Sequence, residues 1–163
     1  MTHPRFGAAT ALLFAGLYLL APASAMGQDG VTQRAGGAFD LTLAPAAPPL
    51  HGGRTTTGRM LLDKQYFGDL AGSGAGEMLS ARSDTKGSAA YVAIERVSGT
   101  LRGKAGSFVI QHSGTMSAGG QQLSISIVPD SGTGELEGIS GKMTINMVGA
   151  KHFYEIEYLL PKK

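Results

Sequence analysis

Apolar and polar side chains alternate with a period of two residues along most of the chain after residue 35. Residues 121–129 are the clearest case: Leu123, Ile125 and Ile127 share one face, and polar side chains occupy the other. This period is that of a β-strand with one buried face. Outside the first 25 residues, no apolar i, i+3, i+4, i+7 pattern persists. The pattern therefore predicts an all-β protein.

Eight alternating segments follow one another, and short glycine-bearing turns separate most of them. The expected strands are residues 36–43, 58–67, 68–81, 88–101, 106–116, 121–129, 142–148 and 152–160. The connections 102–105, 117–120 and 149–151 have the length of hairpin turns, and each contains glycine. Residues 44–57 include three prolines, which cannot join a central ladder, so a loop is expected there. A solvated connection and a lid over a pocket are the two interpretations of this loop.

Eight antiparallel strands in sequence order predict a single up-and-down β-barrel of the calycin-like kind, because closure removes exposed strand edges. A barrel of this size is either packed with side chains or wide enough for one small ligand. The last strand carries Phe153 and Leu159 on the face opposite Tyr154 and Ile156. Apolar residues on both faces point to a covered outer surface and a homo-oligomer. Isolated bulky residues outside a barrel need no such explanation.

The first 25 residues have the layout of a cleaved secretory signal peptide. Arg5 supplies the positive charge, residues 6–20 are apolar, and Ala23-Ser24-Ala25 has the small-x-small cleavage pattern. A membrane-spanning helix needs about 20 apolar residues, so no stable membrane anchor is expected after cleavage. The expected organisation is a signal peptide (1–25), a flexible leader (26–35) and a barrel (36–161), in a periplasmic or secreted protein. Translation from Met26 would instead leave the protein cytoplasmic.

The amino-acid composition excludes several kinds of functional site. The chain has no cysteine, which excludes disulfides, a thiolate nucleophile and a lipid anchor on cysteine. Its net charge is only +2 and it has no basic run, so nucleic acid is not an expected partner. His51, His112 and His152 do not have the i, i+4 spacing of a helical zinc site. No metal and no cofactor are expected.

Several segments resemble a bacterial family known as domain of unknown function 3224. They are GRMLLDKQYFGDL, GEMLSA, GSAAYVAIERVSGTL, GSFVIQHSGTM, LSISIVPDSGTGELEGISGKM and HFYEIEYLLP, which span nearly all of residues 36–161. The resemblance implies the fold of plant allene oxide cyclase, an eight-stranded antiparallel barrel, and SGTGELEGISG resembles the glycine-rich hairpin of that wider group. It implies no activity. The export signal and the long proline-rich loop depart from what the resemblance leads us to expect.

Polar groups on otherwise apolar strands are the best candidates for a ligand-binding site, because burying an uncompensated charge is costly. Glu95 shares a face with Tyr91, and His112 shares a face with Phe108 and Ile110 on the next strand. If both faces point inward, Glu95 and His112 can approach across one ladder as an acid/base pair. The alternative is that Glu95 pairs with a surface cation and His112 is a hydrogen-bonded core histidine.

Two further carboxylates, Glu77 and Asp130, lie next to glycine-containing segments. Glu77 follows Gly74-Ala75-Gly76, so it either lines the mouth of the barrel or is a solvated carboxylate near a turn. Asp130 belongs to a turn-forming Pro-Asp-Ser-Gly sequence, in which its side chain is expected to bond its own backbone. The candidate ligand-binding residues are Glu77, Tyr91, Glu95 and His112, and no catalytic residue is assigned.

Three classes of function follow from the barrel. The favoured one is an exported protein that binds a small hydrophobic or amphipathic molecule in the barrel interior. The second is a cyclase-like or isomerase-like enzyme acting on a hydrophobic substrate with a carboxylate acid/base, in line with the resemblance. The third is a structural or oligomeric envelope protein with a filled barrel. A sizeable cavity would argue against the third class, and a raised carboxyl pKa at Glu95 would favour the second.

Overall fold

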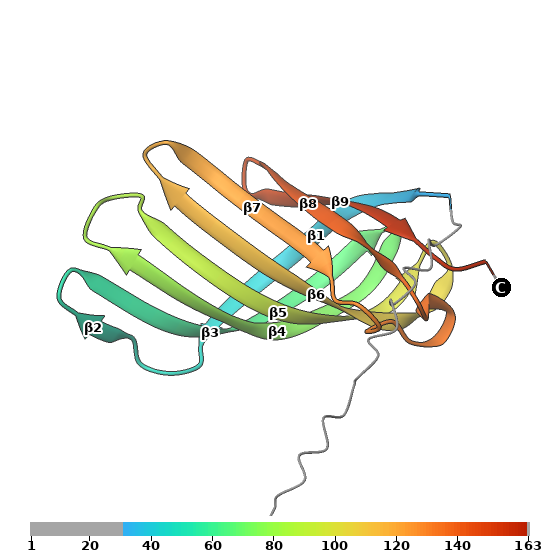
Figure 1. Cartoon of the computed structure of the whole chain (residues 1–163), viewed down its shortest axis with the longest axis horizontal. Coiled ribbons are helices and arrows are strands. Elements are labelled where there is room, and N and C mark those ends of the chain that lie inside the picture. Colours follow the sequence, from blue (N-terminus) through green and yellow to red (C-terminus); the bar gives the residue numbers. More distant parts are fainter. Residues whose placement is uncertain (1–30, 163) are drawn as a thin grey trace, which may run out of the picture.

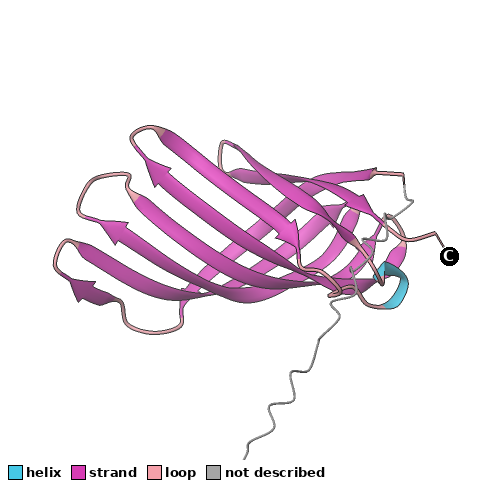
Figure 2. Ribbon diagram, in the orientation of Figure 1, coloured by secondary structure: helices cyan, strands magenta, loops and turns pink. Residues whose placement is uncertain are grey.

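The computed structural model describes residues 31–162, and the expected signal peptide and the first half of the leader lie outside them. Within the described residues, nine strands and one 3₁₀ turn follow in order (Figures 1 and 2). They are β1 (Gln33–Pro45), β2 (Leu50–Gly52), β3 (Thr55–Gly68), β4 (Leu70–Ser83), β5 (Ala89–Leu101), β6 (Lys104–Ser117), β7 (Gly120–Ile127), η1 (Gly134–Leu136), β8 (Ser140–Val148) and β9 (Lys151–Leu159). The first strand thus begins three residues before the expected domain boundary.

The strands form one closed antiparallel barrel. The order of hydrogen-bonded neighbours is β1-β9-β8-β7-β6-β5-β4-β3-β2, and β1 also pairs with β3, which closes the cylinder. Eight strands make the wall, as predicted, because the short β2 pairs only with β3 and stays outside the circuit. Closure leaves little open edge, and what remains lies between β7 and β8, which pair only at Ile125–Met143 and Ser126–Lys142.

The expectation of a plain loop at residues 44–57 is wrong at both ends, because β1 continues to Pro45, which pairs with Met60, and the second half of the segment forms a hairpin. Leu50–Gly52 pairs with Thr55–Thr57, and Gly53 turns the chain between them with a φ of 55°. Glycine adopts this left-handed conformation without a steric penalty. The prolines lie at positions 45, 48 and 49, before the paired segment, so they do not interrupt this hairpin.

One end of the barrel is plugged by the connection between β7 and β8. Residues 128–139 form no hairpin, unlike the segment that they resemble, but turn through η1 across this end. Leu136 and Ile139 are each only 1% exposed and pack into the core with Leu101 and Phe108. The plugged end, at the right of Figure 1, therefore holds most of the hydrophobic core.

The inward and outward faces follow the alternation of the sequence. On β7, Ile125 and Ile127 are buried and the adjoining Ser124 is exposed.

On the outer face of β9, Phe153 is 39% exposed, and no partner chain covers it in this structure, so the homo-oligomer stays a prediction. No helix among residues 31–162 is long and apolar enough to cross a membrane.

Candidate functional site

The half of the barrel away from the plug holds a cavity of about 450 Å³. Its side walls are apolar side chains from several strands: Leu41, Leu62, Met78, Met116, Leu123 and Ile145. Lys64 and His112 line it and are only 6% and 5% exposed, which places them at its deep end. Arg82 and Met147 also line it and are exposed, which places them at its mouth. The cavity is a one-ended pocket with an apolar wall and a polar floor.

Glu95 lies just beneath this floor and is fully buried. Lys64 Nζ donates to Glu95 Oε2 at 2.7 Å, and His112 Nε2 lies 3.1 Å from the same oxygen. The Tyr66 hydroxyl donates to Glu95 Oε1 at 2.7 Å. An ionised carboxylate only accepts hydrogen bonds, so His112 must carry its proton on Nε2. Three donors from two strands, β3 and β6, therefore converge on one carboxylate from β5.

Strand register explains how these side chains meet. Lys64 pairs with Gly74 across β3 and β4, and Gly76 pairs with Glu95 across β4 and β5. The Glu95 carboxylate reaches towards Lys64 over Gly74. A Cβ at Gly74 would lie 2.9 Å from Glu95 Cδ and 3.0 Å from Tyr66 Cε2, and it would overlap Glu95 Oε1. The missing side chain of Gly74 is therefore what makes room for the carboxylate.

The electrostatics favour an ionised Glu95. Burial acts to raise the pKa of Glu95, but the His112 hydrogen bond, the charge and hydrogen bond of Lys64, and the Tyr66 hydroxyl together hold that pKa below its usual value. Burial also raises the pKa of Tyr66, as does the Glu95 charge, so this phenol stays protonated. Glu95 is thus an acceptor at neutral pH, not a reservoir of a proton for general acid catalysis.

Burial lowers the pKa of Lys64 more than the nearby Glu95 raises it. The lysine keeps its short contact with the carboxylate, and we therefore describe the pair as ionic. Its Nζ also lies 4.7 Å from the centre of the Phe39 ring, over the aromatic face. A cation at this position is favoured by the ring quadrupole.

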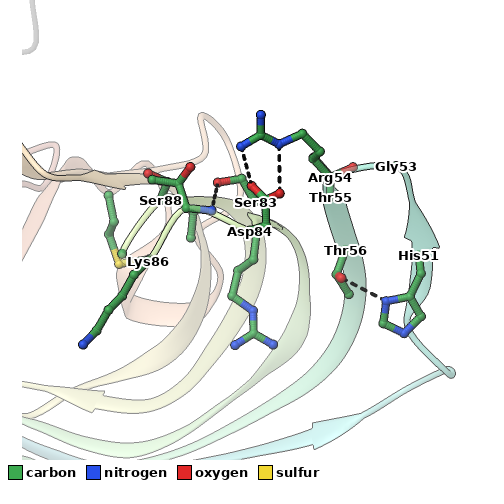
Figure 3. A pocket seen from close by; sticks show the side chains of 14 residues that line it. His51, Gly53, Arg54, Thr55, Thr56, Ser83, Asp84, Lys86 and Ser88 are labelled. Carbon is green, nitrogen blue, oxygen red and sulfur yellow. Dashed lines mark hydrogen bonds and ion pairs between the residues drawn. The ribbon is translucent and has the colours of Figure 1, made fainter.

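A second, more polar hollow of about 580 Å³ lies at the rim of the open end (Figure 3). Arg54, from the β2–β3 turn, forms two hydrogen bonds with Asp84 of the β4–β5 turn, at 2.8 and 3.0 Å. The rim hollow shares Arg82, Ala89 and Met116 with the deeper cavity. It therefore forms a vestibule to the interior, tied across two turns by a surface ion pair.

Of the four candidate residues, the structure places three on the inner face of the barrel and one, Glu77, on the outer face. Glu95 and His112 both face inward and are in contact, and Tyr91 lines the cavity beside Gly114. Glu77 does not line the mouth, nor is it near a turn. It lies on the outer face in the middle of β4, where it pairs with Arg59 at 2.8 Å. Glu77 is the residue next to Met78, which points inward. Because successive side chains of a strand point to opposite faces, the sequence alternation alone places Glu77 on the outer face.

Lys64, Tyr66 and Gly74 belong to the polar cluster but were missed from the sequence. The signal for Lys64 was the same as for Glu95: a charge between Leu62 and Tyr66, on an otherwise apolar strand face. Gly74 carries no such signal. The close approach of the Glu95 and Tyr66 side chains to its backbone depends on the tertiary structure and leaves no local pattern.

Comparisons with known proteins agree with the barrel. Residues 35–158 match the family model described as a protein of unknown function, DUF3224. A crystal structure of a protein of unknown function from the DUF3224 family of Shewanella oneidensis MR-1 is similar, with 45% identity and a TM-score of 0.76. The match covers 81% of this chain and 100% of that one. The comparison with curated proteins gives no match. With its family model matched over nearly the whole barrel, the chain belongs to the DUF3224 family.

Proposed function

We propose that the protein binds a small hydrophobic or amphipathic molecule, which enters through the open end of the barrel. The observation that carries this proposal is the one-ended apolar cavity of about 450 Å³. Ligand pockets in proteins commonly have roughly 300–1,000 Å³ and apolar walls with a few polar groups. The plug at residues 128–139 leaves the opposite end as the entrance.

The other two classes of function fit this cavity less well. A filled structural barrel would leave no room of this size among Leu62, Met78 and Leu123. An enzyme that uses a carboxylic acid as a proton donor needs a raised carboxyl pKa, and the pKa of Glu95 is lowered. These points favour binding over acid catalysis by Glu95.

A matched pair of substitutions on β4 tests the proposal. Met78 lines the cavity, whereas its neighbour Leu79 is 56% exposed on the outer face. Binding of the apolar fluorophore N-phenyl-1-naphthylamine is measured by titration. We expect Met78→Trp to fill the cavity and weaken binding about tenfold or more, and Leu79→Trp to leave it unchanged.

The fold of both variants is checked by far-UV circular dichroism and urea unfolding. Equal affinity in two folded variants would show that the probe binds elsewhere and would overturn the proposal. The chain has no natural tryptophan, so fluorescence of the new indole reports independently whether each position meets the probe.

A further inference from the structure

We propose that Lys64 captures an apolar aldehyde as a reversible imine inside the barrel. This inference rests on the proposed binding function and names the chemical class of the ligand. Among the described residues, Lys64 is the one amine that lines the cavity. Lys86, Lys104, Lys142, Lys151 and Lys162 are all exposed.

The buried ion pair is a costly way to fill a barrel. The side chains of Lys64 and Glu95 are only 3% and 0% exposed. Taking two charges out of water costs several kcal/mol per ion, and apolar residues of similar volume are often as stable or more so. Eight-stranded barrels can be packed with apolar side chains alone. The charges are therefore better explained by chemistry at the cavity floor than by stability.

The opposite charges of Lys64 and Glu95 cancel, so the cavity floor has no net charge. This favours an uncharged ligand over a charged one. The Lys64 ammonium is already compensated by Glu95 at 2.7 Å, so a ligand carboxylate would meet an uncompensated repulsion from Glu95. An uncharged carbonyl brings no such charge into the apolar cavity. Burial lowers the pKa of Lys64, which increases the share of the neutral amine that can attack a carbonyl carbon.

The reaction conserves atoms and charge without an outside reagent. Lys64 passes a proton to Glu95, and the neutral Nζ attacks the aldehyde carbon to form a carbinolamine. Glu95, which is ionised at rest and carries only the proton received from Lys64, returns it to the carbinolamine hydroxyl, which leaves as water while the C=N bond forms. The product is a protonated imine with one N–H, in place of an ammonium with three.

The existing contacts fit this product. Its single N–H can keep the hydrogen bond to Glu95 Oε2, and its positive charge replaces that of the ammonium one for one. Tyr66 and His112 hold the carboxylate from its other sides, at 2.7 and 3.1 Å, and so position the counterion of the imine. The site that stabilises the lysine pair is therefore also electrostatically suited to a protonated imine.

Reductive trapping tests the inference on the full chain. The protein is mixed with equimolar trans-cinnamaldehyde, reduced with borohydride to fix any imine as a secondary amine, and mapped by peptide mass spectrometry. We expect labelling of Lys64 to exceed that of any exposed lysine severalfold, because the cavity holds the apolar aldehyde beside Nζ and burial lowers the pKa of Lys64, which increases the share of the neutral amine. Excess cinnamyl alcohol, which cannot condense, should compete with this labelling.

Matched variants separate the two proposals. Lys64→Arg should lose the adduct, whereas the exposed Lys142→Arg should keep both the adduct and the binding of N-phenyl-1-naphthylamine. Labelling of exposed lysines only, with probe binding intact in the unmodified protein, would overturn the imine and leave the binding function standing. Failure of the unmodified protein to bind the probe would overturn the binding function instead. The peptide map of the labelled natural protein tests the inference even if Lys64→Arg does not fold.

Discussion

Gly74→Ala is the sharpest test of how the polar cluster is built. The added methyl group would overlap Glu95 Oε1 and lie 3.0 Å from Tyr66 Cε2. Gly74 does not have a positive φ, so alanine meets no backbone strain of its own there. The substitution therefore acts on the barrel through the position of the Glu95 carboxylate.

The expected cost follows from the ion pair. Displacing the carboxylate leaves Lys64 buried without its counterion, and breaking a buried pair in this way costs about 3–5 kcal/mol. Replacing glycine by alanine within a strand returns about 0.5–1 kcal/mol of conformational entropy. The net destabilisation should be about 2–4 kcal/mol, a large part of the roughly 5–15 kcal/mol that holds a typical domain together.

Urea unfolding, followed by circular dichroism, measures this cost, and two comparisons make it specific. Gly36→Ala is the control on β1, because a Cβ there would lie at an ordinary 3.5 Å from the Tyr154 carbonyl oxygen. In a Lys64→Met/Glu95→Ala background, with neither carboxylate nor orphaned ammonium, Gly74→Ala should cost little. A cost that stays undiminished in that background, or a stable Gly74→Ala single variant, would refute the explanation given for Gly74.

Two other predictions concern acid stability and the plug. Because the pKa of Glu95 in the folded protein lies below its ordinary value of 4.5, the unfolded state binds more protons at acidic pH. The stability from Glu95 should thus be complete above about pH 4.5 and be lost as the pH falls through the folded pKa. Urea midpoints should fall more steeply below pH 4.5 in the natural protein than in Glu95→Gln, and parallel curves would contradict this assignment. Leu136→Ala should cost about 2–5 kcal/mol in urea unfolding, because Leu136 is 1% exposed in the plug, whereas a loss below about 1 kcal/mol would mean that the plug packs loosely.

Most of the fold could be predicted because its signal is local. A period of two in Leu123, Ile125 and Ile127 is enough to identify β7 and its inner face, and glycine marks the turns. The β2 hairpin was missed because the prolines before it dominate the composition of the segment. The plug was missed as well, because its apolar residues are spread through a glycine-rich connection of irregular structure.

The site was only partly predictable because its contacts are not local. Glu95 and His112 could be paired because they lie on consecutive strands, 17 residues apart. Lys64 reaches Glu95 from 31 residues away and across an intervening strand. That contact depends on the barrel curvature and on the empty space above Gly74, neither of which a strand pattern encodes.

The plugged end has a practical consequence for attaching the protein to something else. The first and last described strands meet there: Gln33 pairs with Tyr158, and Arg102 of the β5–β6 turn bonds the Arg34 carbonyl at 2.9 Å. In Figure 1 the strand β1 starts, and β9 ends, at the same end of the cylinder as the plug. A surface, a tag or a fused domain joined through either residue 31 or residue 162 would sit behind the barrel. The entrance to the cavity would then face away from the point of attachment and stay open to a ligand.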